Sequence, residues 1–207
     1  EEILSRLDRA LRVSYAVFKL GKDQRRRYLD MCGKQGYLTP IGRCVGIFDL
    51  SSLSTGHGAS SVFPTLCMLN HACTGNANPS WHVDKRRALV HAVKPIREGE
   101  EITFCYAESF DTRKERQFDL QERWQFECAC AVCSATGTRQ SASDLRRTQC
   151  KMLLDNVRQK AAAGQDAAAL EDAESLLATV DEEFGSAIEK TELCVMAYQV
   201  AGRVTGS

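Results

Sequence analysis

Three cysteines within six residues, Cys128, Cys130 and Cys133, constrain this chain more than any other feature of its sequence. A tight turn at this spacing lets several sulfurs converge on one ion, and structural zinc sites take four tetrahedral ligands that are often all thiolates. The spacing therefore predicts a zinc site with one more ligand elsewhere in the chain. The residues alone leave that ligand open among His71, Cys73, Cys105 and Cys150.

The alternative for this cluster is a reactive or disulfide-forming set of thiols, which we disfavour because Cys128 and Cys130 are poorly placed to pair with each other. The other cysteines are scattered in apolar contexts, where cysteine usually behaves as a small buried hydrophobe. We therefore expect a reducing compartment, the nucleus or the cytoplasm.

Composition limits the kind of partner. The 207 residues include 43% hydrophobic side chains, enough for one packed domain or for a domain with a small helical appendage. Lys and Arg number 27, as do Asp and Glu, so no basic excess points to nucleic acid. We interpret the run Lys22–Arg27 as a solvated helix face. No apolar run reaches the roughly 18 residues of a membrane span, and no membrane association is predicted.

The N-terminal part of the chain reads as helical over residues 1–32, with an interruption at Gly21. Residues 33–61 are rich in Gly and Ser, and they predict loops around a short strand at Cys44–Leu50.

The middle of the chain predicts strands. Trp81–Val83 and Ala88–Val93 flank a polar turn and form a candidate hairpin, and Glu101–Tyr106 alternates as a strand does.

The C-terminal part predicts helices. Residues 111–125 form a charged helix that ends at Trp124, residues 134–143 read as a linker, and from Asp144 onward the pattern is helical in about three helices. The expected core positions of these helices include Leu145, Leu153, Val157, Leu170, Leu177, Phe184, Leu193 and Met196.

Three short motifs follow one another along the chain: Asn70–Asn76, Gly99–Tyr106 and Phe126–Cys133. Together they resemble the signatures of SET-domain protein lysine methyltransferases, nearest to the branch that carries MYND zinc fingers and to its fungal relatives. The resemblance implies an α+β fold: the C-terminal part of a SET β-fold with a helical insert, a post-SET zinc site and an α-helical C-terminal tail.

The resemblance also implies site residues. Asn70 and His71 would contact S-adenosyl-L-methionine, and Phe126 would pack on its adenine. Cys73 would be the fourth zinc ligand beside Cys128, Cys130 and Cys133. Tyr106 matches the family's catalytic tyrosine, which also borders the cofactor, and Phe48 and Trp124 would line the substrate channel.

The same resemblance divides the chain into a helical insert at 1–40, the C-terminal SET core at 41–110, a zinc-binding segment at 111–135 and a helical region at 144–207. Ala72 and Gly75 depart from the family's usual Ser and Pro. We find no MYND finger and no upstream strand pair with its Gly-x-Gly motif, so we expect the chain to begin inside the SET domain.

The leading hypothesis is therefore a monomeric enzyme that methylates lysine side chains of a histone or non-histone protein. The alternative is a non-catalytic, zinc-containing protein-interaction module. A zinc-binding nucleic-acid module is disfavoured by the zero net charge.

Overall fold

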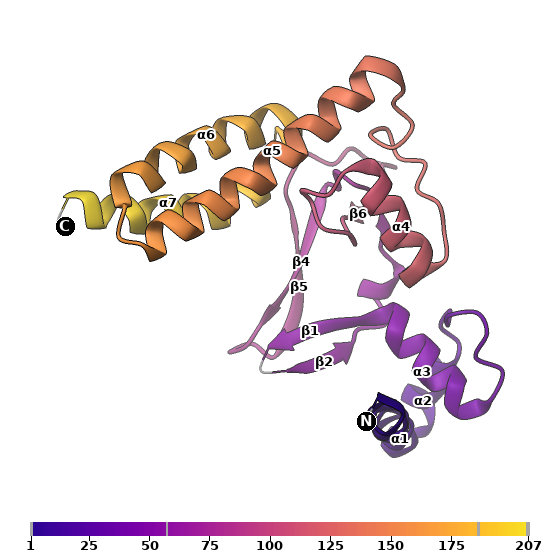
Figure 1. The fold of residues 1–207 in the computed structure, drawn as a ribbon. Coiled ribbons are helices and arrows are strands. Elements are labelled where there is room, and N and C mark those ends of the chain that lie inside the picture. The colour runs from indigo at the N-terminus through magenta and orange to yellow at the C-terminus, as the bar shows by residue number, and fades with distance from the viewer. Residues whose placement is uncertain (1, 57, 186, 206–207) are drawn as a thin grey trace. The chain divides into compact units, whose positions relative to one another are not determined.

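A computed structural model of the chain describes residues 2–56, 58–185 and 187–205, and its mixture of helices and short strands confirms the predicted α+β class (Figure 1). The chain forms two compact units. Unit one comprises Glu1–Asn70, Pro79–Val90 and Leu120–Glu127. Unit two comprises His71–Asn78, His91–Asp119 and Cys128–Ser207.

Unit one is built on three helices: α1 (Glu2–Lys19), α2 (Lys22–Leu29) and α3 (Pro40–Ser51). The first two confirm the helical pattern before residue 32 and its interruption at Gly21. Their core is small, and the buried residues at its centre are Val17, Tyr28 and Ile47. The Tyr28 hydroxyl donates to the carbonyl of Cys44 at 2.7 Å, which ties α2 to α3.

Helix α3 corrects the strand predicted at Cys44–Leu50. The side chain of Thr39 accepts a hydrogen bond from the backbone N–H of Gly42 at 3.0 Å, and Pro40 occupies the first turn, so both helix-start signals are present. The glycines of this segment suggested a loop, but Gly46 permits close packing instead. A Cβ on Gly46 would lie 3.2 Å from the backbone of Lys34, so glycine lets the preceding loop pack closely on the helix.

The strands form three two-stranded sheets among the described residues: β1 (Ser52–Gly56) with β2 (Ala59–Val62), β3 (Asn70–His71) with β6 (Thr103–Phe104), and β4 (Ala77–His82) with β5 (Arg87–Ala92). The first pair is antiparallel, with Ser52 opposite Val62. The third pair confirms the predicted hairpin, and its strands contribute residues to both units. A short 3₁₀ turn, η1 (Leu66–Met68), precedes β3.

Strand β6 is shorter than the predicted strand Glu101–Tyr106, because side chains rather than a neighbouring strand form hydrogen bonds with the backbone at its two ends. Before β6, Asn76 donates to the Glu101 carbonyl at 2.9 Å and accepts from the Thr103 N–H at 3.0 Å. After it, the ring of His71 accepts from the Tyr106 N–H at 2.9 Å. The backbone of this segment is therefore satisfied without a longer ladder.

Unit two holds three long helices that pack side by side: α5 (Gly137–Ala162), α6 (Asp166–Phe184) and α7 (Ala187–Thr205) (Figure 1). Together with α4 (Arg113–Trp124), they confirm the helices predicted for the C-terminal part. The linker at 134–143 is partly wrong, because α5 begins seven residues before Asp144. Arg113 stabilises this early turn by donating to the side chains of Gln140 at 2.9 Å and Asp144 at 2.6 Å.

The core of these helices contains the buried residues Cys150, Leu176, Val180, Phe184 and Leu193. Val157 is also buried, as predicted, whereas Leu145 is 68% exposed and does not belong to the core. The buried face of α5 runs instead through Arg147, Cys150 and Val157. In the part of the chain that the structure describes, no helix is long and apolar enough to cross a membrane.

Candidate functional site

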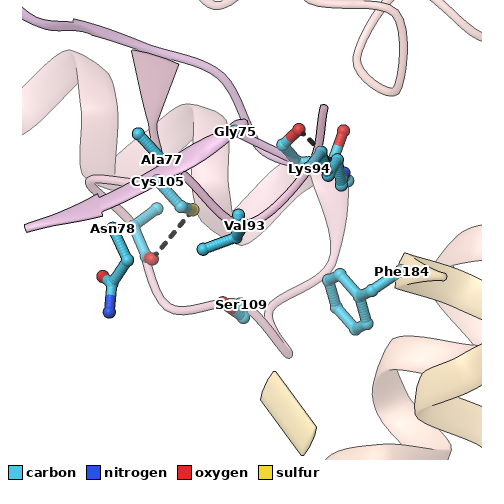
Figure 2. Close-up of a pocket in the computed structure, with 10 residues that line it drawn as sticks. Gly75, Ala77, Asn78, Val93, Lys94, Cys105, Ser109 and Phe184 are labelled. Carbon is cyan, nitrogen blue, oxygen red and sulfur yellow. Dashed lines mark hydrogen bonds between the residues drawn. The ribbon is translucent and has the colours of Figure 1, made fainter. Parts of the chain in front are cut away.

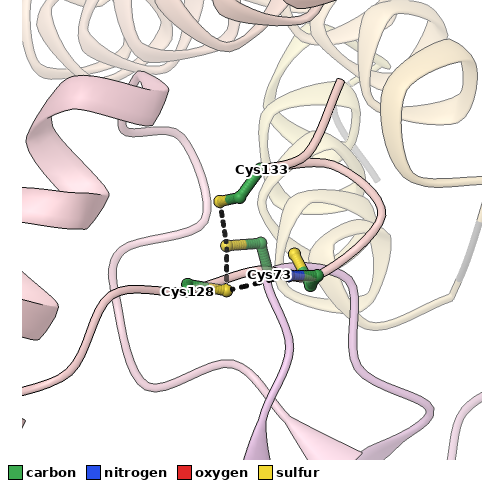
Figure 3. A group of neighbouring side chains, drawn as sticks. Cys73, Cys128 and Cys133 are labelled. Atoms are coloured by element: carbon green, nitrogen blue, oxygen red, sulfur yellow. Dashed lines mark hydrogen bonds between the residues drawn. The ribbon is translucent and has the colours of Figure 1, made fainter. Parts of the chain in front are cut away.

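Four cysteines from distant parts of unit two converge on one point. The sulfurs of Cys73, Cys128, Cys130 and Cys133 all lie within 4.8 Å of one another. The Cys73 sulfur is 4.0 Å from that of Cys128 and 3.4 Å from that of Cys133 (Figure 3). None of the four forms a disulfide.

This geometry suits a tetrahedral thiolate site. With metal–sulfur bonds of about 2.3 Å, the sulfurs of such a site are about 3.8 Å apart, close to the separations observed here. Two other candidates for the fourth ligand are committed elsewhere: the Cys105 thiol donates to the Ala107 carbonyl at 3.2 Å, and Cys150 lies in the helical core. The third candidate, His71, lies beside the cluster, with its Nε2 3.3 Å from the Cys73 sulfur. These four sulfurs could therefore hold one metal ion.

The turn that carries three of these cysteines is held by α4. The side chain of Gln117 accepts from the Cys128 N–H at 2.8 Å and donates to the Cys128 carbonyl at 2.7 Å. Within the turn, the Cys130 N–H points at the Cys128 sulfur at 3.5 Å, and the Ser134 N–H donates to the Cys130 carbonyl at 2.8 Å. These bonds fix the backbone of the turn from which the three sulfurs project.

Burial and mutual hydrogen bonds shift the pKa values of three of these cysteines. Hydrogen bonds with Cys133 and Cys73 lower the pKa of Cys130, whereas hydrogen bonds with Cys130 and Cys133, together with burial, raise the pKa of Cys73. Burial raises the pKa of Cys128 to about 12. A divalent cation bound to the sulfurs would favour the thiolate form of its cysteine ligands.

Two nitrogen donors reach the cluster from outside it. The Nε of Arg116 donates to the Cys73 sulfur at 3.2 Å, and its Nη2 lies 3.8 Å from the Cys133 sulfur. The Nε2 of His71 lies 3.3 Å from the Cys73 sulfur. Burial opposes the charge on Arg116, but the sulfurs outweigh it, and the pKa of Arg116 is raised.

His71 also connects the cysteines to Tyr106. Its Nδ1 accepts the Tyr106 N–H, so the ring proton belongs on Nε2, which faces Cys73. Burial lowers the pKa of His71 to about 4 and keeps the ring neutral near pH 7. The ring centroids of His71 and Tyr106 are 5.2 Å apart, and those of Phe104 and Tyr106 are 4.7 Å apart. The rings of His71 and Phe104 thus lie against the ring of the predicted catalytic tyrosine.

The remaining predicted site residues belong to unit one. Trp124 is half-buried, and its indole N–H donates to the Leu50 carbonyl at 3.3 Å. Phe48 is half-buried beneath the guanidinium of Arg9, which lies 5.7 Å from the ring centroid. Asn70 is exposed and Phe126 is half-buried. The cofactor and channel roles of these four residues stay predictions.

A small pocket of unit two adjoins the predicted site: Cys105 and Ala107, which line it, flank Tyr106 in the chain, and Thr74 follows Cys73. Among the described residues that line it are Asn78, Cys105 and Phe184, and none of its lining residues belongs to the predicted site (Figure 2). Its lysine, Lys94, donates to the Thr74 carbonyl at 3.2 Å. We assign this pocket no function.

Sequence reasoning missed Arg116, Gln117 and Asn76. The first two lie within a helix whose pattern reads as charged and solvated, and their contacts involve segments distant in the chain. One signal was available: Arg116 is four residues before the buried Leu120 and therefore on the same face of α4. Asn76 closes the Asn70–Asn76 segment, and it is buried with both ends of its amide bonded.

Comparison with known proteins decides the family. The family model described as SET domain matches residues 2–107, about half of the chain. The chain belongs to the SET domain family. This confirms the resemblance drawn from the Asn70–Asn76 and Gly99–Tyr106 segments. The match ends one residue after Tyr106, so that the cysteine turn and the C-terminal helices follow the matched region.

Curated relatives of this SET chain include lysine methyltransferases. The histone-lysine N-methyltransferase set5 of Schizosaccharomyces pombe is 34% identical over 110 residues, which cover 53% of this chain and 34% of the relative. The histone-lysine N-methyltransferase SMYD3 of Mus musculus is 35% identical over 35% of this chain and 16% of its own length. The protein-lysine N-methyltransferase SMYD4 of Homo sapiens is 35% identical over 41% of this chain and 10% of its own length. The matched regions thus span about a third or less of these relatives.

Proposed function

We propose that the protein transfers a methyl group from S-adenosyl-L-methionine to a lysine side chain of a protein. The observation that carries this proposal is the SET domain match over residues 2–107, which includes Tyr106. Relatives named as histone-lysine and protein-lysine methyltransferases support it. A histone substrate would require access to the nucleus, and a non-histone substrate is compatible with the cytoplasm.

The residues around Tyr106 suit a cationic cofactor. The electron-rich faces of Phe104 and Tyr106 favour positive charge, and the neutral ring of His71 adds none of its own. When bound, S-adenosyl-L-methionine supplies an activated methyl group on a sulfonium. We assign Asn70, His71, Tyr106 and Phe126 to its binding, and Phe48 and Trp124 to the lysine channel.

Tyr106 would act by orientation. In methyl transfer the amine must be neutral and in line with the methyl group, so the protein contributes mainly alignment and exclusion of water. The Tyr106 hydroxyl can accept a hydrogen bond from the amine and fix its direction. The hydrogen bond from the Tyr106 N–H to the ring of His71 holds the backbone of Tyr106 in place.

The four cysteines would hold a structural zinc ion. All four positions around the metal would be taken by sulfur, so this ion would have no place for a substrate or water and would stabilise the fold. The zinc-containing interaction module remains the second candidate, because a closed thiolate site serves folding in either case.

The test uses the intact protein with radiolabelled S-adenosyl-L-methionine and core histones, and measures cofactor binding by calorimetry. We expect Tyr106→Phe to slow transfer by about 100-fold or more while cofactor affinity changes by less than about threefold, because the lost hydroxyl acts on the amine. Tyr198→Phe, which alters an exposed tyrosine on α7, is the matched control. Equal losses of transfer and of cofactor binding would refute the catalytic role, and a protein that does not bind the cofactor would favour the interaction module.

A further inference from the structure

Arg116 is a cation in an environment that ordinarily excludes one. Its side chain is 0% exposed. In the described part of the chain, its guanidinium contacts two sulfurs, those of Cys73 and Cys133, and the carbonyl oxygen of Asp111. Arginine stays protonated at any physiological pH, so a full positive charge is buried here.

A buried charge needs a counter-charge, and neutral thiols are too weakly polar to provide one. Four thiolates around one zinc ion would carry a net charge of minus two, which also needs compensation once it is buried. The buried guanidinium needs a negative partner and the thiolate complex needs a positive one. Each can serve the other, because the guanidinium faces the sulfurs directly. The contact is therefore unfavourable for a protonated cysteine cluster and favourable for a metal–thiolate complex.

The donors are also distributed unevenly over the cluster. Both Arg116 and the Nε2 of His71 point at Cys73, the cysteine that comes from outside the turn of the other three. Hydrogen bonds to a metal-bound sulfur withdraw charge from it and fix its direction. Cys73 depends most on such help, because it lies more than fifty residues before the turn that carries the other three sulfurs.

We propose that Arg116 is a positioning residue of the cysteine centre: its buried guanidinium offsets the charge of a four-thiolate zinc complex and orients Cys73 within it. This inference rests on the proposed zinc site. Because Arg116 belongs to α4 and also binds the Asp111 carbonyl before that helix, zinc binding and the packing of α4 in unit two become coupled.

The test compares variants of one helix. Arg116→Met removes the charge and keeps most of the side-chain length, Arg116→Lys keeps the charge without the planar fork, and Lys114→Met removes an exposed positive charge two residues away. The intact protein is loaded with zinc, its metal content is measured by mass spectrometry, and its zinc affinity is measured by competition with a coloured chelator. Cys130→Ser removes a proposed ligand, and it shows how much zinc affinity is lost when the site itself is broken.

We expect Arg116→Met to weaken zinc binding by about 10- to 100-fold, the range typical of residues that support metal ligands, with Arg116→Lys between it and the wild type and Lys114→Met unchanged. If Arg116→Met does not fold, Arg116→Lys becomes the test, because we expect it to lose more zinc affinity than the exposed control Lys114→Met. Wild-type affinity in the Arg116 variants would overturn this inference and leave the zinc site standing. A wild-type protein that takes up no zinc would instead overturn the zinc site itself.

Discussion

A buried carboxylate in the helical region offers a sharp test of the energetics of unit two. Glu183 at the end of α6 is 3% exposed, and it pairs with Arg147 at 2.8 Å and with Arg146 at 2.9 Å. Arg147 is 0% exposed and also donates to the carbonyl of Ser109, three residues after Tyr106. The pair thus connects α5, α6 and the segment that follows the proposed catalytic tyrosine.

We expect Glu183→Gln to destabilise the protein by about 3–5 kcal/mol. The change keeps the size of the side chain but leaves the guanidinium of Arg147 buried without its counter-charge, and breaking one side of a buried ion pair typically costs about that much. The amide NH₂ of glutamine would also face a guanidinium donor where a carboxylate oxygen now accepts. Glu182→Gln is the matched control. Glu182 is 68% exposed and 3.3 Å from Arg146, so its loss should cost no more than about 1 kcal/mol.

Urea unfolding followed by far-ultraviolet circular dichroism measures both variants, because α5, α6 and α7 contribute much of the helical signal. With a denaturant slope of roughly 2 kcal/mol per molar urea, the midpoint for Glu183→Gln should fall by about 1.5–2.5 M and that for Glu182→Gln by about 0.5 M or less. Equal shifts in the two variants would refute the reasoning, since they would show that burial does not strengthen the Arg147–Glu183 pair.

Two further predictions concern cysteine reactivity and close backbone packing. Cys150 should resist thiol reagents in the folded protein, because burial, followed by the nearby Glu183 carboxylate, raises its pKa to about 11 and leaves roughly one thiol in a thousand ionised near pH 8. The exposed Cys32 should react readily, and peptide mass mapping after brief alkylation distinguishes the two; equal labelling would contradict the burial of Cys150. Gly75→Ala should lower the thermal midpoint by an amount that corresponds to about 1–3 kcal/mol, because an added Cβ would lie 2.6 Å from the Thr103 carbonyl oxygen. An unchanged midpoint would show that the backbone at Gly75 and that at Thr103 can move apart without loss of stability.

Some features of this protein follow from the sequence because they depend on neighbouring residues. The spacing of Cys128, Cys130 and Cys133 allows three sulfurs to converge within one turn, whatever surrounds them. The charged helix before them and the hairpin at Ala77–Ala92 also follow from local periodicity and a polar turn. The resemblance to SET methyltransferases rested on the order of three short segments, and the SET domain match confirms it.

Other features were decided by tertiary structure. The glycines of α3 looked like loop residues, but Gly46 lets a separate segment pack against a helix. Spacing alone left the fourth ligand open, and the resemblance pointed to Cys73; the fold brings its sulfur to the other three across more than fifty residues of chain. Arg116 reads as one more solvated charge of a polar helix until the fold buries it against two sulfurs. Local chain geometry determines which residues form a helix or a turn, whereas burial and charge pairing depend on segments that meet only when the chain folds.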